Sequence, residues 1–256
     1  MYDINRIHDY VYKEFNIRLD AYKSVQMNRR IENFISKLEF NTTSDFIREC
    51  SIDKHLRENF LDLITINVTQ FFRNSDIFFR LEELFKKYIP KRDVYRIWSS
   101  ACSNGSEAYS VAMILENINM PNYEILATDI DKKMLNYAEK AIYTTYDLRN
   151  VSSEYIDKYF NFFNDKFKVK DFIRNKIEFI RHDLILDYFP SCFDLILCRN
   201  VVIYFTKDEK MKIYNKFYDS LNNNGVVFIG ATENIYDYKQ IGFNKLGTFF
   251  YQKVVK

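Results

Sequence analysis

Residues 96–115 read RIWSSACSNGSEAYSVAMIL, and this stretch decides the fold. A short apolar run, Val94 to Ser99, breaks into small polar residues around Gly105 and then resumes with the apolar spacing of a helix. A strand, a turn of small residues and a helix are typical of nucleotide-type loops, where small side chains let the backbone approach a ligand. A second apolar run, Glu124 to Thr128, ends at Asp129, about where an acidic residue meets ribose hydroxyls. The pair predicts a cofactor that contains adenosine.

The chemistry of this loop favours S-adenosylmethionine over a dinucleotide. A pyrophosphate needs several glycines and bare backbone N–H groups at a helix N-terminus, whereas this loop has one glycine and carries Glu107 in the first helical turn. A carboxylate repels phosphate but accepts hydrogen bonds from the α-amino group of S-adenosylmethionine. No GxxxxGK[ST] phosphate loop occurs, so an ATPase or kinase has no support. The simpler alternative is an ordinary strand-to-helix turn in which Glu107 only favours the helix dipole.

The composition is that of a soluble globular protein. With 256 residues, of which 47% are hydrophobic and 28% charged, we expect two units with a core each. A net charge of +2 does not favour binding to nucleic acid or to a membrane surface. The N-terminus lacks an apolar signal core, no run approaches the roughly 20 residues of a membrane span, and the four cysteines have no CxxC spacing. We therefore expect a cytoplasmic protein, with no metal site because its three histidines lack partners at ligand spacing.

The periodicity changes once along the chain. Residues 1–68 have helical spacing and predict a small all-α domain, and a connecting segment with a helix from Ile77 to Tyr88 occupies residues 69–92. From residue 93 to 256, strand-like and helical runs alternate, which predicts an α/β fold with a Rossmann-like parallel sheet. The expected strands are Val94–Ser99, Glu124–Thr128, Asp194–Cys198 and Val226–Ile229, the expected helices are Glu107–Asn117, Lys132–Ala141 and Lys207–Leu221, and Leu246–Val254 is expected to pair antiparallel.

One segment interrupts this alternation. Tyr159 to Ile180 carries short alternating runs separated by Asn164-Asp165 and Arg174-Asn175, which predict hairpin turns. We therefore expect a small antiparallel β insertion at about residues 155–181. It is either an elaborated edge without a task or a docking surface that pairs with a strand of a partner.

Four segments together resemble the CheR-type chemotaxis receptor methyltransferases. They are Asn67-Val-Thr-Gln-Phe-Phe-Arg73, the loop WSSACSNGSEAYS, the ATDID around Asp129, and Cys198-Arg-Asn-Val-Val-Ile-Tyr-Phe205. The order and spacing are similar to those of the family, and Gly230-Ala-Thr-Glu-Asn234 is similar to a further family segment. Each motif alone is weak, but jointly they are specific and cover nearly the whole chain.

The resemblance implies methyl transfer from S-adenosylmethionine to glutamate side chains on the cytoplasmic helical bundle of chemoreceptors, which gives glutamyl methyl esters. A glutamate with a pKa of about 4.3 is ionised at neutral pH and can attack the methyl group directly. No general base and no metal are then required, and catalysis depends on holding oxygen, carbon and sulfur in line.

The resemblance also implies the site residues. Arg73 and Tyr204 would lie near the transferring methyl and orient the substrate carboxylate; without the family, a surface arginine and a core tyrosine are the favoured interpretations. The residues implied at the cofactor are Asn67, Thr69, Arg73, Ala101, Glu107, Asp129, Asp183, Leu184, Asn200 and Val201. Asn200 has independent support, because Arg199 and Asn200 interrupt an apolar run, which is costly unless both side chains find partners.

Two features depart from the family. Members that tether to a receptor tail peptide have a glycine in the antiparallel insertion, and this chain has none between Gly105 and Gly225, so we expect a tail-independent enzyme. The family uses a basic helix against the receptor, and here Lys23, Arg29, Arg30 and Lys37 are diluted by Asp20 and Glu32, so a solvated mixed-charge helix is an alternative.

Two other functions compete with this interpretation. A nucleic-acid methyltransferase should show a basic surface with an [ND]-P-P-[YF] or Pro-Cys motif, and neither motif is present. The stronger alternative is a non-catalytic adaptor that senses S-adenosylmethionine. We expect a monomer whose partners are chemoreceptors, without direct membrane insertion.

Overall fold

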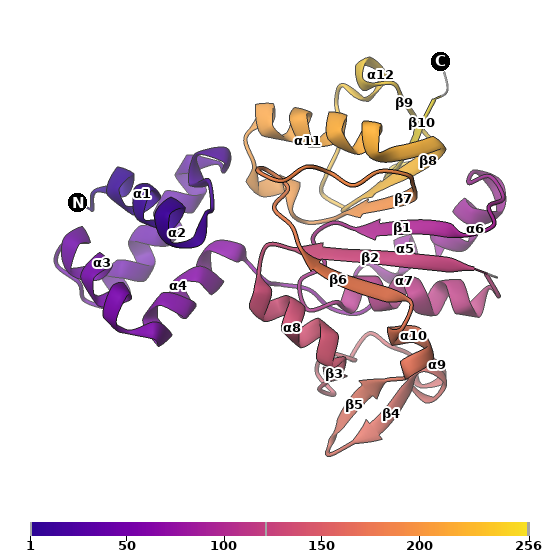
Figure 1. The fold of residues 1–256 in the computed structure, drawn as a ribbon, viewed down its shortest axis with the longest axis horizontal. Coiled ribbons are helices and arrows are strands. Elements are labelled where there is room, and N and C mark those ends of the chain that lie inside the picture. The colour runs from indigo at the N-terminus through magenta and orange to yellow at the C-terminus, as the bar shows by residue number, and fades with distance from the viewer. Residues whose placement is uncertain (1, 121, 255–256) are drawn as a thin grey trace. The chain divides into compact units, whose positions relative to one another are not determined.

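The computed structural model describes residues 2–120 and 122–254, which form two compact units. The first unit runs from the N-terminus to Asn67 and includes Tyr204–Lys210; the second comprises Val68–Ile203 and the chain from Met211 onward. Figure 1 shows helices in the first and a central sheet in the second. The predicted fold class, an all-α part followed by an α/β part with a small antiparallel sheet, is confirmed.

In the described part of the chain, four helices lie wholly within the first unit, and the first turn of the helix that begins at Lys207 joins them. The four are α1 (Ile4–Phe15), α2 (Ser24–Lys37), α3 (Thr43–Ile52) and α4 (Lys54–Thr65), with a short 3-10 turn η1 at Leu19–Ala21. Side-chain oxygens of Asp3, Thr42 and Asp53 accept backbone N–H groups at the starts of α1, α3 and α4, which satisfies donors that the helices leave free. Phe46 and Phe60, both fully buried, meet edge to face at 4.9 Å in the core.

A returning segment completes this unit. Tyr22 and Phe205 form an antiparallel bridge, and their rings lie 5.0 Å apart. The N–H of Lys23 donates to the carbonyl of Tyr204 at 2.8 Å, and the N–H of Thr206 donates to that of Ala21 at 2.9 Å. By these contacts Tyr204 belongs to the helical unit.

The second unit is organised by a seven-stranded sheet in the order β6-β2-β1-β7-β8-β10-β9. The strands are β1 (Tyr95–Ser99), β2 (Tyr123–Asp129), β6 (Ile177–Arg181), β7 (Phe193–Cys198), β8 (Leu221–Ile229), β9 (Phe243–Lys245) and β10 (Phe250–Lys253). The first five in this order are parallel, and β10 and β9 are antiparallel, as expected for the C-terminal run. The chain reverses its direction of travel across the sheet between β1 and β7, where α/β folds bind ligands.

Helices cover both faces of this sheet. Successive residues of β1 point to opposite faces: Ile97 joins the core cluster with α5 (Ser75–Phe78), α6 (Arg80–Lys87) and α7 (Ser106–Asn117), while Trp98 contacts Phe217 of α11 (Lys207–Ser220) at 5.4 Å. The predicted single helix from Ile77 to Tyr88 is wrong, because α5 and α6 meet at Phe79. The ring of Phe79 stacks on Phe72 at 5.9 Å, a contact that no helical periodicity shows.

The predicted antiparallel insertion is present, but its extent differs. A three-stranded sheet has the order β3-β5-β4, from β3 (Ile142–Tyr143), β4 (Phe160–Phe163) and β5 (Lys166–Val169), between α8 (Lys132–Lys140), α9 (Ser153–Tyr159) and α10 (Asp171–Arg174). Asn164 and Asp165 both have positive φ, as a two-residue hairpin turn requires. The second predicted hairpin, at Arg174-Asn175, is wrong.

The reason lies in β6. Arg174 ends α10, and Ile177–Arg181 pairs parallel with β2 in the main sheet, so residues up to 181 do not all belong to the insertion. As an edge strand, β6 alternates between half-buried and exposed residues, which is the pattern of a hairpin strand. A short helix, α12 (Tyr238–Ile241), precedes β9. Among the helices of residues 2–120 and 122–254, none has the length and apolar character needed to cross a bilayer.

Candidate functional site

Apart from Thr69 and Arg73, which precede β1, the predicted cofactor residues of the second unit lie at the carboxyl ends of neighbouring parallel strands. Ala101 and Glu107 follow β1, Asp129 ends β2, Asp183 and Leu184 follow β6, and Asn200 and Val201 follow β7. Parallel strands have their carboxyl ends at one edge of the sheet, so the topology brings these segments together at the position where such folds bind ligands.

Backbone hydrogen bonds fix the loop after β1. Ser100 donates its N–H and its hydroxyl to the carbonyl of Leu197, at 2.9 and 2.8 Å, and the N–H of Cys102 donates to Thr128 at 2.9 Å. Gly105 has a φ of 83°, and a Cβ there would lie 2.7 Å from the Cβ of Ala138. The glycine is therefore needed for the left-handed turn and the close packing of α8.

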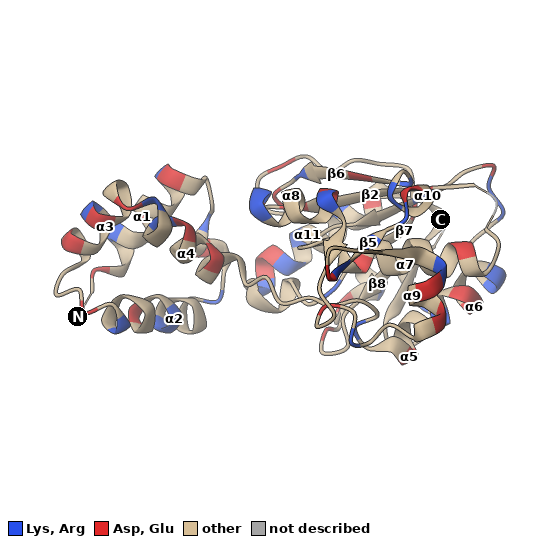
Figure 2. Cartoon of the chain, turned by 90° about the horizontal axis from the view of Figure 1, so that it is seen from below, with Lys and Arg blue, Asp and Glu red and all other residues tan. Residues whose placement is uncertain are grey.

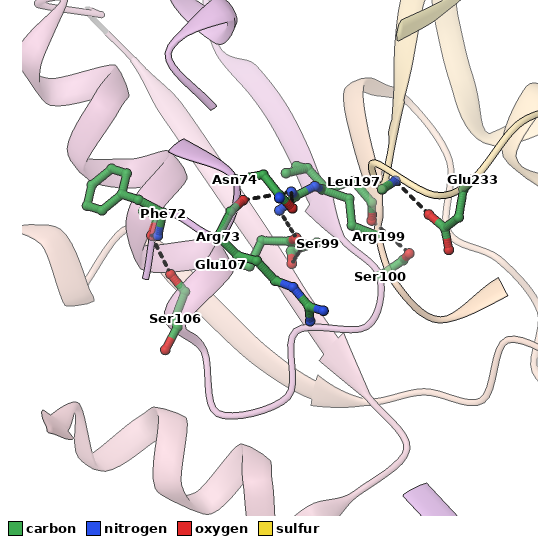
Figure 3. A network of polar contacts seen from close by, with 12 residues as sticks. Phe72, Arg73, Asn74, Ser99, Ser100, Ser106, Glu107, Leu197, Arg199 and Glu233 are labelled. Carbon is green, nitrogen blue, oxygen red and sulfur yellow. Dashed lines mark hydrogen bonds and ion pairs between the residues drawn. The ribbon is translucent and has the colours of Figure 1, made fainter. Parts of the chain in front are cut away.

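Glu107 is a buried carboxylate at the start of α7, only 8% exposed. Its Oε1 accepts the hydroxyl of Ser99 at 2.8 Å, and its Oε2 accepts Nη1 of Arg199 at 3.2 Å (Figure 3). Burial raises the pKa of the Glu107 carboxyl, while the charge of Arg199 and the hydroxyl of Ser99 act in the opposite direction. The structure thus holds an anionic group in a fixed orientation where one helix begins.

Arg199 connects this carboxylate to the segment before α5. Its Nη2 donates to the carbonyl of Arg73 at 2.8 Å and to Oδ1 of Asn74 at 3.4 Å (Figure 3). The guanidinium lies over the rings of Phe78 and Phe228, at 4.7 and 4.8 Å from their centroids. Sequence reasoning noticed Arg199 only as a polar interruption and missed that it joins three segments.

The segment from Val68 to Asn74 is held in a fixed conformation as well. The N–H of Phe72 donates to the hydroxyl of Ser110 in α7 at 2.9 Å, and Phe72 has a positive φ of 49°. Nη1 of Arg73 donates to the carbonyl of Val68 at 2.7 Å. Arg73 is half-buried, and its charge opposes the rise in the pKa of Glu107.

Asp129 anchors the loop that follows β1. Its Oδ2 accepts the N–H of Ser103 at 2.7 Å, and its Oδ1 accepts the N–H of Asp131 at 3.0 Å. Burial raises the pKa of Asp129 to about 6. The hydroxyl of Ser103 is buried without a hydrogen-bond partner in the described part of the protein, so a ligand hydroxyl or amine would satisfy it. No sequence signal distinguishes Ser103 from the other serines of this loop.

The segment after β6 is ordered by its own side chains. Oδ1 of Asp183 accepts the N–H groups of Ile185 and Leu186, at 2.7 and 3.4 Å, and burial raises the pKa of Asp183. Leu184 is buried, and His182 packs against Trp98 at 5.3 Å, as expected for a packing residue.

The remaining predicted residues are divided between the units. Asn67 ends the first unit, where its Nδ2 donates to Oγ1 of Thr65 at 3.0 Å, and Thr69 lies two residues further on in the second. Tyr204 lines a cavity of about 160 Å³ in the first unit together with residues of α2 and its start, among them Lys23 and Arg30, and with Ile66 after α4. Arg73 and Tyr204 are thus carried by different units.

The charges of the second unit suit a cationic ligand better than a phosphate. Glu107 and Glu233 are buried carboxylates that follow β1 and β8, Asp129 is a buried carboxylate that ends β2, and Arg199 is a buried guanidinium that follows β7. S-adenosylmethionine carries an ammonium and a sulfonium group, so these residues fit it. In residues 2–120 and 122–254, no group of three or more His, Cys, Asp or Glu side chains is placed to hold a metal ion.

Comparison with known proteins agrees with this site. Residues 67–249 match the family "CheR methyltransferase, SAM binding domain", and residues 2–65 match "CheR methyltransferase, all-alpha domain". A chemotaxis protein methyltransferase of Listeria monocytogenes is 38% identical over 96% of this chain and 97% of its own length. One of Borreliella burgdorferi is 32% identical over 96% and 93%, and one of Escherichia coli 28% over 90% and 83%. The chain therefore belongs to the CheR methyltransferase family, with its all-α domain and its S-adenosylmethionine-binding domain.

Proposed function

We propose that this protein transfers the methyl group of S-adenosylmethionine to glutamate side chains on the cytoplasmic helices of chemoreceptors, giving glutamyl methyl esters. Membership of a family of S-adenosylmethionine-dependent methyltransferases supports the reaction class, and relatives named chemotaxis protein methyltransferases support the setting. No observation favours the alternative of a non-catalytic adaptor.

The observation that carries this proposal is the buried carboxylate of Glu107. Ser99 and Arg199 fix its two oxygens at the start of α7, where a dinucleotide-binding fold would place a phosphate. A fixed carboxylate there selects the α-amino group of the cofactor, and a charge-assisted hydrogen bond would hold it. Each carboxylate oxygen of Asp129 accepts one backbone N–H, from Ser103 or Asp131, and its remaining lone pairs would accept the ribose hydroxyls.

The other site residues have smaller parts in this proposal. Asn67 and Thr69 would contact the amino-acid portion of the cofactor, Ala101 would line the loop, and Asp183 and Leu184 would lie near the adenine. Asn200 and Val201, which follow β7, would complete the crevice.

The bound cofactor supplies a methyl group on a positively charged sulfur. A carboxylate oxygen of the substrate would form a bond to this methyl carbon while the carbon–sulfur bond breaks and its electron pair stays on sulfur. Arg73 would orient the carboxylate, and the phenol of Tyr204 would add one directed hydrogen bond. Arg73 must not bind the ground state too tightly, because strong pairing would lower the nucleophilicity of the carboxylate.

The chain organisation suggests a division of tasks between residues 1–68, the connector 69–92 and residues 93–256. The exposed basic side chains of α2 and its start, Lys23, Arg29, Arg30 and Lys37, would face acidic receptor helices. An acidic residue, Glu32, lies between them in the sequence of α2, where the ribbon of Figure 2 is coloured both blue and red. We further propose a cytoplasmic monomer that does not bind nucleic acid and does not need a receptor tail peptide. Phe162 of the antiparallel insertion is 70% exposed, so a titration with receptor tail peptides tests whether this surface binds one.

Methyl-labelled S-adenosylmethionine and receptor-bearing membranes test the proposal. We expect label in receptor-sized bands, released as methanol by base, and much slower labelling by Arg73→Ala. Cofactor binding without transfer to any receptor would refute the enzyme and favour the adaptor. Titration with receptor tail peptides tests tethering separately, and tight binding would refute tail independence.

A further inference from the structure

Glu233 has no part in the function proposed above, although it is buried at the same edge of the sheet. It follows β8 and is 8% exposed. Its Oε2 accepts the N–H of Gly230 at 2.6 Å, on the side chain labelled Glu233 in Figure 3. The backbone N–H of Asn200 lowers the pKa of the same carboxyl, and Oε1 has no hydrogen-bond partner among the described residues. A buried charge is costly unless polar groups compensate it, and the N–H groups of Gly230 and Asn200 compensate the charge of Glu233.

The two N–H groups come from different loops. β7 and β8 are parallel neighbours, and their last paired residues are Cys198 and Ile229. The chain after each strand therefore starts side by side with the other. A Cβ on Gly230 would lie 2.7 Å from Oε2 of Glu233 and 3.0 Å from the backbone nitrogen of Asn200. These three residues are in contact, and no side chain fits between them.

The backbone of Asn200 is in the left-handed region, with a φ of 61°. Asparagine occupies this region more readily than other non-glycine residues, but it can also adopt extended and helical backbone, so a neighbouring contact can select the turn. A trans peptide is planar, so the carbonyl of Arg199 points opposite to the N–H that meets Glu233. Glu233 therefore fixes the orientation of the peptide between Arg199 and Asn200.

We propose that Glu233 is a positioning residue for the cofactor: its carboxylate receives the N–H groups of Gly230 and Asn200 and holds the left-handed turn that presents Asn200 and Val201 to S-adenosylmethionine. This inference rests on the proposed function in so far as Asn200 contacts the cofactor. Without the carboxylate, both N–H groups are unpaired in a buried place and the turn loses its anchor.

Calorimetric binding of S-adenosylhomocysteine tests this without requiring methyl transfer. We expect Glu233→Ala to raise the dissociation constant about tenfold, as the loss of an anchored contact would. Hydrogen exchange of the Asn200 amide should accelerate in the same variant, and KM for the receptor should stay unchanged. Glu124→Ala, an exposed glutamate of β2, is the matched control and should change none of these values.

A second set of variants makes the outcome decisive. Gly230→Ala forces the same contact apart, so it should also raise the dissociation constant for S-adenosylhomocysteine about tenfold. The double variant with Glu233→Ala should bind no more weakly than either single variant. If Glu233→Ala does not fold, Glu233→Gln keeps the shape and should still weaken binding and accelerate exchange.

Three results would overturn the inference. The first is a folded Glu233 variant with unchanged affinity for S-adenosylhomocysteine and unchanged exchange of the Asn200 amide. The second is an equal rise of KM for receptor and cofactor. The third is a double variant in which the two losses of affinity multiply. If the wild-type protein fails to bind S-adenosylhomocysteine, the proposed function is refuted, and the exchange rate of Asn200 still decides whether Glu233 holds the turn.

Discussion

Glu107→Gln is the sharpest test of how the cofactor is selected, because it removes one charge and keeps the shape of the side chain. A hydrogen bond to a charged group contributes about 1.5–3 kcal/mol. Glu107 shares its charge with Arg199 at 3.2 Å, so we expect a loss near the lower part of that range. A loss of about 2 kcal/mol corresponds to a roughly 30-fold higher dissociation constant for S-adenosylhomocysteine.

The same change affects stability. Removing one partner of a buried ion pair costs about 3–5 kcal/mol when the other charge is left alone. Arg199 keeps the carbonyl of Arg73 and the faces of Phe78 and Phe228, so the free energy of unfolding should fall less, by about 2–3 kcal/mol. For a chain of this size the melting temperature should drop by about 4–12 °C, so binding must be measured well below the transition.

Two ligands separate the role of Glu107 from general damage to the site. In calorimetry, S-adenosylhomocysteine should lose affinity, whereas 5′-methylthioadenosine, which lacks the amino-acid portion, should bind Glu107→Gln almost as it binds the wild type. Glu116→Gln is the matched control, because Glu116 lies on the same helix and accepts the hydroxyl of Tyr123 at 2.8 Å away from the site. Equal losses for both ligands would refute the contact between Glu107 and the ammonium group.

Three further predictions concern stability, pH and transfer. Gly105→Ala should lower the free energy of unfolding by about 2–4 kcal/mol through its left-handed backbone and the clash with α8, whereas Gly247→Ala, with nothing within 4 Å, should change it by less than about 0.5 kcal/mol in urea unfolding. Asp129, with a pKa of about 6 against an ordinary 3.8, takes up a proton in the folded state between these values, so its contribution to stability should fall as pH rises through this window. In unfolding measured at pH values near 4 and 6, Asp129→Asn should remove its share of this slope. Arg73→Ala should lower kcat by about 10- to 100-fold if its guanidinium orients the substrate, and an unchanged kcat in labelled-methyl assays would contradict that role.

The sequence predicted the parts of the fold that local patterns encode. The strands around Ile97, Ile125 and Leu195 were recognisable because buried parallel strands are continuous apolar runs. β6 was assigned to the wrong sheet, since an edge strand and a hairpin strand alternate in the same way. The break between α5 and α6 was also missed, because helical spacing continues across Phe79.

In the site, too, local contacts were predictable from the sequence and long-range contacts were not. Glu107 and Ser99 are eight positions apart, and the motif around them pointed to a ligand. Arg199, in contrast, meets Glu107 across 92 positions and Arg73 across 126, and no periodicity relates such distant residues. The roles of Glu107 and Asp129 at the cofactor stay predictions until ligand binding is measured.

The returning segment Tyr204–Lys210 has a practical consequence for anyone who cuts or recombines this protein. The polypeptide passes between the two units three times, after Asn67, after Ile203 and after Lys210, although the family boundary near residue 66 suggests a single junction. A truncation that starts at Val68 would leave Phe205 without Tyr22 and the carbonyl of Tyr204 without the N–H of Lys23. A chimera that exchanges the helical unit should therefore carry residues 204–210 from the same parent.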